Sequence, residues 1–90
     1  MNVRTKRDEM MCLYDKVKAT PNHNDKLLLI KAAGFCWAVK RDAKPVVSAL
    51  GVTMFRDNMG IDVAKFPESY QDEFVSRLIK AGHKVEVIDL

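Results

Sequence analysis

The sequence predicts an α+β fold of two layers, in which three helices pack on a mixed sheet of about five strands. The chain has 90 residues, enough for one domain. Its hydrophobic positions change between helical spacing and short apolar runs in the order α-β-β-α-β-β-α-β, which suggests a single sheet with helices packed on it. The content of 48% hydrophobic and 30% charged residues is that of a globular protein and excludes a disordered chain. We expect one domain over residues 1–90, with 1–7 as a flexible basic arm.

The first part of the chain predicts one helix and two strands. Residues 8–18 should be helical, because their apolar side chains recur at i, i+3, i+4 and i+7. Pro21 and the polar residues after it end this helix. The apolar run 27–30 predicts a buried strand, and the aromatic and β-branched run 35–39 predicts a second one. Residues 33–34, Ala-Gly, separate the two strands.

The second part predicts two helices and three strands. A helix over about 42–50 presents an apolar face and ends at a glycine. Strands 52–55 and 61–66 should form a hairpin around a polar turn. A third helix over 70–81 precedes a last strand, 85–90. The expected core comprises Leu13, Val17, Leu27, Leu29, Val46, Val47, Leu50, Phe74, Leu78 and Val87.

Charge and cysteine content limit the class of partner and the compartment. Residues 1–44 carry ten Lys and Arg against five acidic residues, whereas 45–90 carry five against seven. The net charge of +5 in residues 1–44 can favour binding to a polyanion. No apolar stretch approaches the 20 residues or so that span a bilayer. Cys12 and Cys36 lie in apolar patterns without metal-ligand spacing, so we expect reduced thiols and a cytoplasmic protein.

The sequence contains little that indicates a catalytic site. There is no Gly-x-x-x-x-Gly-Lys phosphate loop. His23 and His83 stand at loop positions with no evident nucleophile, and the apolar neighbours of Cys36 should make its thiol inert. The aspartates form no recognisable ligand set. We therefore expect no enzyme activity, no cofactor and no metal.

The most specific feature is the pair Phe35-x-Trp37, whose side chains share one face of a strand. Two such rings either fill the core or form a platform on which bases stack. The residue pattern alone favours the core. Basic residues flank the strand, however, and that arrangement fits both nucleic-acid binding and a solvated strand end. These are Lys31, Lys40, Arg41 and Lys44.

Residues 10–90 resemble the N-terminal mismatch-recognition domain, domain I, of the bacterial DNA mismatch repair protein MutS. That family has an apolar strand, a Gly-Asp-Phe-Tyr-Glu segment, a helix opening with Asp-Ala-Lys, a Leu-Gly-Ile-Thr-Leu-Thr-Lys-Arg stretch, and a last helix ending in Leu-x-x-Ala-Gly. The order and spacing of these motifs are similar here. The matching segments are Leu27-Leu28-Leu29-Ile30, Ala33-Gly34-Phe35-Cys36-Trp37, Asp42-Ala43-Lys44, Leu50-Gly51-Val52-Thr53-Met54-Phe55-Arg56 and Leu78-Ile79-Lys80-Ala81-Gly82.

The resemblance implies binding rather than catalysis. In the family, the Phe wedges beside a mispaired base and the Glu forms a hydrogen bond with that base. Phe35 matches the Phe, but Trp37 stands where the Glu would be, and Trp cannot accept a hydrogen bond as a carboxylate does. We therefore expect weakened mismatch specificity. Arg56 matches the first cation of the family's Lys-Arg pair, and Asp57 replaces the second.

Two hypotheses follow. In the first, the chain is a small nucleic-acid-binding module that contacts duplex, mismatched or distorted DNA through Phe35, Trp37, Lys31 and Arg56, beside a larger repair or DNA-processing protein. In the second, it is a protein-interaction module that kept the fold and lost DNA binding. The hypotheses differ in whether the two aromatic rings are exposed beside Lys31 and Arg56 or buried under a helix. Neither hypothesis involves a membrane.

Overall fold

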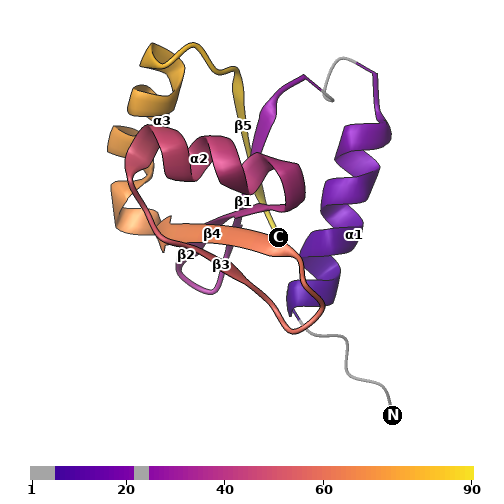
Figure 1. The fold of residues 1–90 in the computed structure, drawn as a ribbon. Helices are drawn as coiled ribbons and strands as arrows, with labels where there is room; N and C mark the ends of the chain where they lie inside the picture. The colour runs from indigo at the N-terminus through magenta and orange to yellow at the C-terminus, as the bar shows by residue number, and fades with distance from the viewer. Residues whose placement is uncertain (1–5, 22–24) are drawn as a thin grey trace.

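The computed structural model describes residues 6–21 and 25–90. It contains three α-helices, two single turns of 3-10 helix and five strands in the predicted order (Figure 1). Helix α1 begins at Lys6, two residues before the expected start of the first helix, and residues 1–5 of the expected basic arm lie outside the described residues. The elements are α1 Lys6–Ala19, β1 Leu27–Ala32, β2 Phe35–Val39, η1 Lys40–Asp42, α2 Ala43–Leu50, β3 Met54–Arg56, β4 Asp62–Pro67, η2 Glu68–Tyr70, α3 Gln71–Lys80 and β5 Val85–Asp89.

The five strands form one mixed sheet in the order β3-β4-β2-β1-β5. Strands β1 and β5 are parallel, and the other neighbouring pairs are antiparallel. The expected hairpin is present as β3 and β4, although β3 is short. The predicted α+β class and the mixed five-stranded sheet are therefore confirmed.

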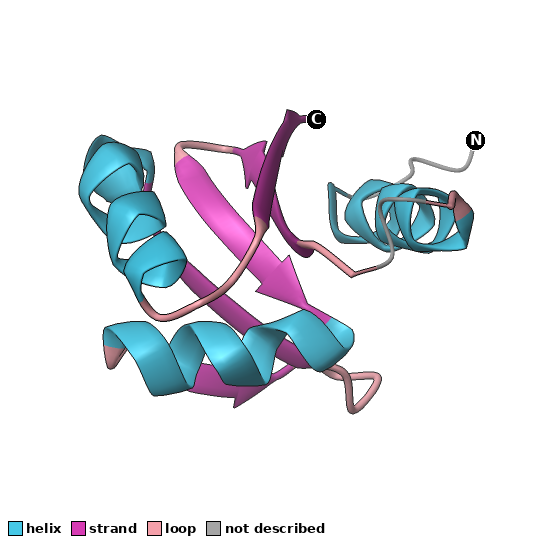
Figure 2. Ribbon diagram, turned by 90° about the horizontal axis from the view of Figure 1, so that it is seen from above, coloured by secondary structure: helices cyan, strands magenta, loops and turns pink. Residues whose placement is uncertain are grey.

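Helices cover both faces of this sheet, so the domain has three layers rather than the two predicted. Helices α2 and α3 pack on one face and α1 packs on the other (Figure 2). The physical reason lies in β1, where all four residues of the apolar run 27–30 are buried. Because successive side chains of a strand point to opposite faces, such a run needs an apolar cover on both sides.

The predicted core corresponds mainly to the α2–α3 face. Leu27, Leu29, Val46, Leu50 and Leu78 are buried there, and the other five predicted positions are partly buried against one of the two cores. The core on the α1 face was largely missed. Its buried residues are Met10, Met11, Tyr14, Leu28, Ile30, Ala32, Val39 and Val63.

The turn between β1 and β2 fixes where β2 begins. Ala32 pairs with Phe35, so Ala33 and Gly34 form a two-residue hairpin loop. Both have positive φ, 54° and 82°, as a type I′ turn requires. This tight turn places Phe35 as the first residue of β2, at one end of the sheet.

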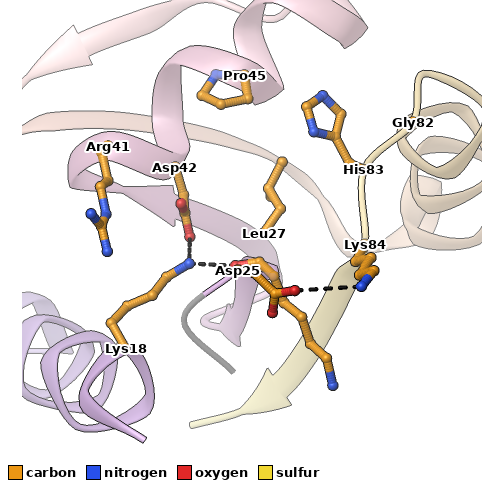
Figure 3. A pocket seen from close by; sticks show the side chains of 10 residues that line it. Lys18, Asp25, Leu27, Arg41, Asp42, Pro45, Gly82, His83 and Lys84 are labelled. Atoms are coloured by element: carbon orange, nitrogen blue, oxygen red, sulfur yellow. Dashed lines mark hydrogen bonds and ion pairs between the residues drawn. The ribbon is translucent and has the colours of Figure 1, made fainter. Parts of the chain in front are cut away.

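A buried carboxylate joins three elements of the fold. Asp42 Oδ2 accepts a hydrogen bond from the backbone N–H of Leu28 in β1, at 2.9 Å. It also forms an ion pair of 2.8 Å with Lys18 Nζ of α1, which in turn donates to the carbonyl oxygen of Lys26 (Figure 3). The Lys18 and Asp42 side chains are only 8% and 10% exposed. Asp42 immediately precedes α2, so this contact ties α1, β1 and α2 together.

The substitution Asp42→Asn should destabilise the domain by about 3–5 kcal/mol, because it leaves the buried Lys18 ammonium without its counter-charge. Thermal or urea unfolding measures the loss. The matched control is Asp15→Asn, which breaks the exposed 2.6 Å pair with Lys40 and should cost at most about 1 kcal/mol. Equal losses for the two variants would contradict a structural role for the buried pair.

Candidate nucleic-acid interface

The two aromatic residues singled out in the sequence lie on the α1 face of β2. They alternate along the strand with Cys36 and Ala38, which are buried in the opposite core. The ring centroids of Phe35 and Trp37 are 6.0 Å apart and the rings meet edge to face, at 64°. Both side chains are half-buried. They are therefore less exposed than a free wedge would be and more exposed than core residues.

A hydrogen bond fixes the orientation of the indole ring. Trp37 Nε1 donates to the carbonyl oxygen of Ala32 across the hairpin, at 2.9 Å. Because Nε1–H is the only donor of the Trp side chain, this contact uses its whole hydrogen-bonding capacity. What Trp37 retains for a ligand is therefore its ring surface.

Lys65 places a cation on the same aromatic surface. It lies opposite Trp37 in the β2–β4 register. Its Nζ is 4.5 Å from the Phe35 ring centroid, 4.8 Å from that of Trp37 and 5.9 Å from that of Phe55. Within residues 6–21 and 25–90, Lys65 forms no ion pair. We call Phe35, Trp37, Phe55 and Lys65 the aromatic–lysine cluster.

The two cations that the sequence analysis assigned to the site lie elsewhere. Lys31 shares a face with Cys36, on the α2–α3 side of the sheet, and its Nζ is 3.6 Å from Asp89. Arg56 pairs in register with Asp62 on that same side, and its Nε is 3.0 Å from the Asp62 carboxylate. The structure thus brings Phe35 and Trp37 together but places Lys31 and Arg56 on the other face.

Sequence reasoning missed Lys65, although β4 carried a usable signal. Val63 and Lys65 alternate with Ala64 and Phe66, which are buried in the α2–α3 core. Lys65 lies opposite Trp37 because β4 is the neighbour of β2 in the sheet. The sequence alone does not predict this strand order.

A hollow of about 310 Å³ opens beside the cluster, between α1 and strands β2, β3 and β4. We call it the α1 cleft. Its buried lining consists of Met10, Met11, Val39 and Val63. Its more exposed lining consists of Trp37, Phe55, Asp57 and Lys65. The cleft therefore has an apolar interior and ring edges, with one cation and one carboxylate near the surface.

A second hollow, of about 310 Å³, lies at the far end of β1 and contains more charge (Figure 3). Two of its cations are already paired. Lys18 contacts Asp42, and Lys84 Nζ is 3.4 Å from Asp25 (Figure 3). Lys26 and Arg41 also line this hollow, and neither forms an ion pair with another described residue, so the hollow retains cations that attract an anion. Its lining contains no Phe, Tyr or Trp ring, whereas the aromatic–lysine cluster combines a cation with stacking surfaces and is therefore the stronger candidate for contact with bases.

Among the residues that the structure describes, Cys36 and His83 do not lie together at one site. Cys36 is fully buried, and burial raises the pKa of its thiol, as the sequence analysis expected. His83 lines the second hollow, and His23 lies outside the described residues. In the described ranges, no three metal-ligating side chains come together, and no helix is long and apolar enough to cross a membrane.

The three-layer arrangement, with a hairpin strand that carries two aromatic rings on one face, defines a small α+β domain. Comparison with known proteins makes this specific, since a family model described as MutS domain I matches residues 8–90. The chain belongs to this family, and the resemblance noted in its sequence is confirmed.

Several curated relatives support this assignment. The chain is 36% identical over 84 residues to the DNA mismatch repair protein MutS of Chlorobium phaeobacteroides and 34% identical over 80 residues to that of Chlorobium limicola. A MutS of Porphyromonas gingivalis is 29% identical over 84 residues. Each match covers 89% of this chain but only 9% of the relative, so the chain spans a small part of the length of the proteins it matches.

Proposed function

We propose that this domain binds nucleic acid through the aromatic–lysine cluster, with little preference for a mismatch over a matched duplex. The observation that carries the proposal is the position of Lys65, whose ammonium lies within 6 Å of three ring centroids and forms no ion pair in the described part of the chain. Ring faces stack on bases and an unpaired cation attracts phosphate, so the cluster offers both contacts that a nucleic acid needs.

The Phe35 ring supplies the stacking surface at the end of the sheet. It begins β2 directly after a two-residue turn, and it is only half-buried. The neighbouring Trp37 ring and Lys65 restrict its movement, so little side-chain entropy remains to be lost on binding. A ring held in this way can insert beside a base step where the duplex unstacks easily.

The chemistry of Trp37 explains why the domain should have little preference for a mismatched over a matched duplex. The indole ring has no acceptor, and its single donor already binds the Ala32 carbonyl oxygen. A mispaired base would therefore find stacking but no directional hydrogen bond from this residue. Stacking alone is tolerant of base identity, because every base has a π-face.

The relatives give the proposal its biological setting. The curated proteins that the chain matches are named as DNA mismatch repair proteins, and domain I makes up a small part of each. We infer that this domain contributes DNA recognition without catalysis and that it acts in the cytoplasm. We also infer that it acts beside a larger repair or DNA-processing protein, which supplies further contacts to the duplex. Modest affinity for DNA by the domain alone is part of this proposal.

Replacing the stacking ring separates binding from packing. Phe35→Ala should weaken binding to duplex DNA by about 1–3 kcal/mol through lost stacking. Because Phe35 is half-buried, its loss should destabilise the fold by less than the roughly 3–5 kcal/mol typical of a buried phenylalanine. Fluorescence anisotropy with a labelled duplex measures the first effect, and thermal unfolding measures the second.

The matched control for Phe35→Ala is Ile79→Ala, which removes a 57%-exposed apolar side chain of α3, away from the cluster, and should leave DNA binding unchanged. A Phe35→Ala protein that is destabilised yet binds DNA normally would contradict the proposal. That result would favour a protein-interaction module instead.

Restoring a carboxylate should restore discrimination. Trp37→Glu should increase the preference for a mismatched over a matched duplex by about 1.5–3 kcal/mol, the usual value of a hydrogen bond to a charged group. Trp37→Phe, which keeps a ring but adds no acceptor, is the matched control and should leave the preference low. Competition titrations with the two duplexes give the ratio directly. A wild-type preference above about 4 kcal/mol would contradict the assigned role of Trp37.

A further inference from the structure

The hollow at the far end of β1 has the features of a site for a small anion, and we call it the basic hollow. Its volume of about 310 Å³ is at the small end of the range for ligand pockets, roughly 300–1,000 Å³. Elements that are far apart in the sequence bring positive charge to this one place (Figure 3). The cations in its lining come from α1, from the residue before β1, from η1 and from the residue before β5. They are Lys18, Lys26, Arg41 and Lys84.

The positive charge of the basic hollow exceeds what its own carboxylates neutralise. The two carboxylates, of Asp25 and Asp42, each form an ion pair with one of the four cations. The other two cations, Lys26 and Arg41, form no ion pair within the described residues. Four cations against two carboxylates leave a net charge of +2 when His83 is counted as neutral. An anion that carries two charges would balance this surplus.

The two cations without an ion pair suit a phosphate group that arrives from solution. Arg41 is exposed and Lys26 is half-buried, so both side chains are accessible to an incoming anion. A guanidinium offers parallel N–H donors that match two oxygens of one phosphate, and an ammonium adds a compact charge. The lining contains no Phe, Tyr or Trp ring, so nothing in it would stack on a base. The basic hollow therefore favours the phosphate group itself.

We propose that the basic hollow binds a phosphomonoester dianion, with Arg41 and Lys26 as its principal contacts. A phosphomonoester carries a charge of about −1.5 to −2 at neutral pH, whereas each diester of a DNA backbone carries a single charge. The surplus charge of the hollow therefore matches the monoester better than the diester. The hollow lies at the opposite end of β1 from the turn that precedes Phe35, so this inference does not depend on the aromatic–lysine cluster.

Calorimetric titrations with methyl phosphate and with dimethyl phosphate test the charge requirement, at a pH where the monoester is a dianion. The monoester should bind with a dissociation constant of about 1 mM or lower, and about tenfold more tightly than the diester. Constant ionic strength keeps the screening of the hollow equal in the two titrations. Equal affinity for the two probes, or no saturable binding of the monoester up to about 10 mM, would overturn the proposal.

Two substitutions with opposite expected effects locate the binding. Arg41→Gln removes an exposed guanidinium, so the fold should persist, and the affinity for methyl phosphate should fall about tenfold. Asp25→Asn removes an exposed carboxylate and releases Lys84, so the affinity should rise several-fold. The matched control is Lys65→Gln, which removes a cation outside the hollow and should leave the affinity unchanged. Unchanged binding by Arg41→Gln, or a failure of Asp25→Asn to tighten binding, would overturn the assignment to this hollow.

A phosphomonoester occurs both in small phosphorylated molecules and at the terminal phosphate of a DNA strand. Two duplexes that differ only in a terminal phosphate or a terminal hydroxyl distinguish these sources. If the ligand is a DNA end, the phosphorylated duplex should bind more tightly, and Arg41→Gln should remove the difference. If the two duplexes bind equally while methyl phosphate still binds, the ligand is a small phosphorylated molecule. A preference for the phosphorylated duplex that persists in Arg41→Gln would overturn the role of the basic hollow.

Discussion

The arrangement of the domain depends on the buried contact between Asp42 and Lys18. A carboxylate and an ammonium that are about nine-tenths buried are stable only when each is paired and hydrogen-bonded. Asp42 meets this condition by contacting Lys18 and the backbone N–H of Leu28 at the same time. The contact holds α1 against one face of the sheet, and Asp42 immediately precedes α2, which packs on the other face. One residue therefore helps to position the helices on both faces.

The candidate interface follows from that placement. Helix α1 covers Leu28, Ile30 and Val39 but leaves Phe35 and Trp37 half-buried at the hairpin end of β2. The sheet therefore presents a partly covered aromatic surface next to the cleft bounded by α1. Rings that are supported on one side and open on the other suit stacking, because they are already oriented before a ligand arrives. The residues that α1 buries and the residues of the proposed stacking surface are thus different parts of the same face.

The sequence predicted the fold well because its signals were local. The spacing of Met10, Leu13, Tyr14 and Val17 indicated the first helix, and the run 27–30 indicated a buried strand. The layer count was wrong because it depends on whether both faces of that strand are covered, which is a property of packing. Met10 and Tyr14 belong to a second core that becomes evident only when α1 is placed opposite α2 and α3.

The candidate site was predictable only in part. Phe35 and Trp37 share a face because side chains two apart in a strand always do. Lys31 was selected for its nearness in sequence and Arg56 for its match to a family motif, yet strand alternation places both on the opposite face, where each meets an aspartate. Lys65 is 28 residues from Trp37 in sequence and joins it only through the β2–β4 register. Contacts of this kind require the strand order, which local patterns do not encode.

The salt dependence of DNA binding tests the central claim most directly. If Lys65 contacts a phosphate, Lys65→Gln should make the slope of log K against log salt less steep by about 0.9, the value for one phosphate contact on duplex DNA. Lys80→Gln, which removes an exposed lysine at the end of α3, should leave the slope unchanged. A Lys65→Gln protein whose slope equals that of the wild type would contradict the account.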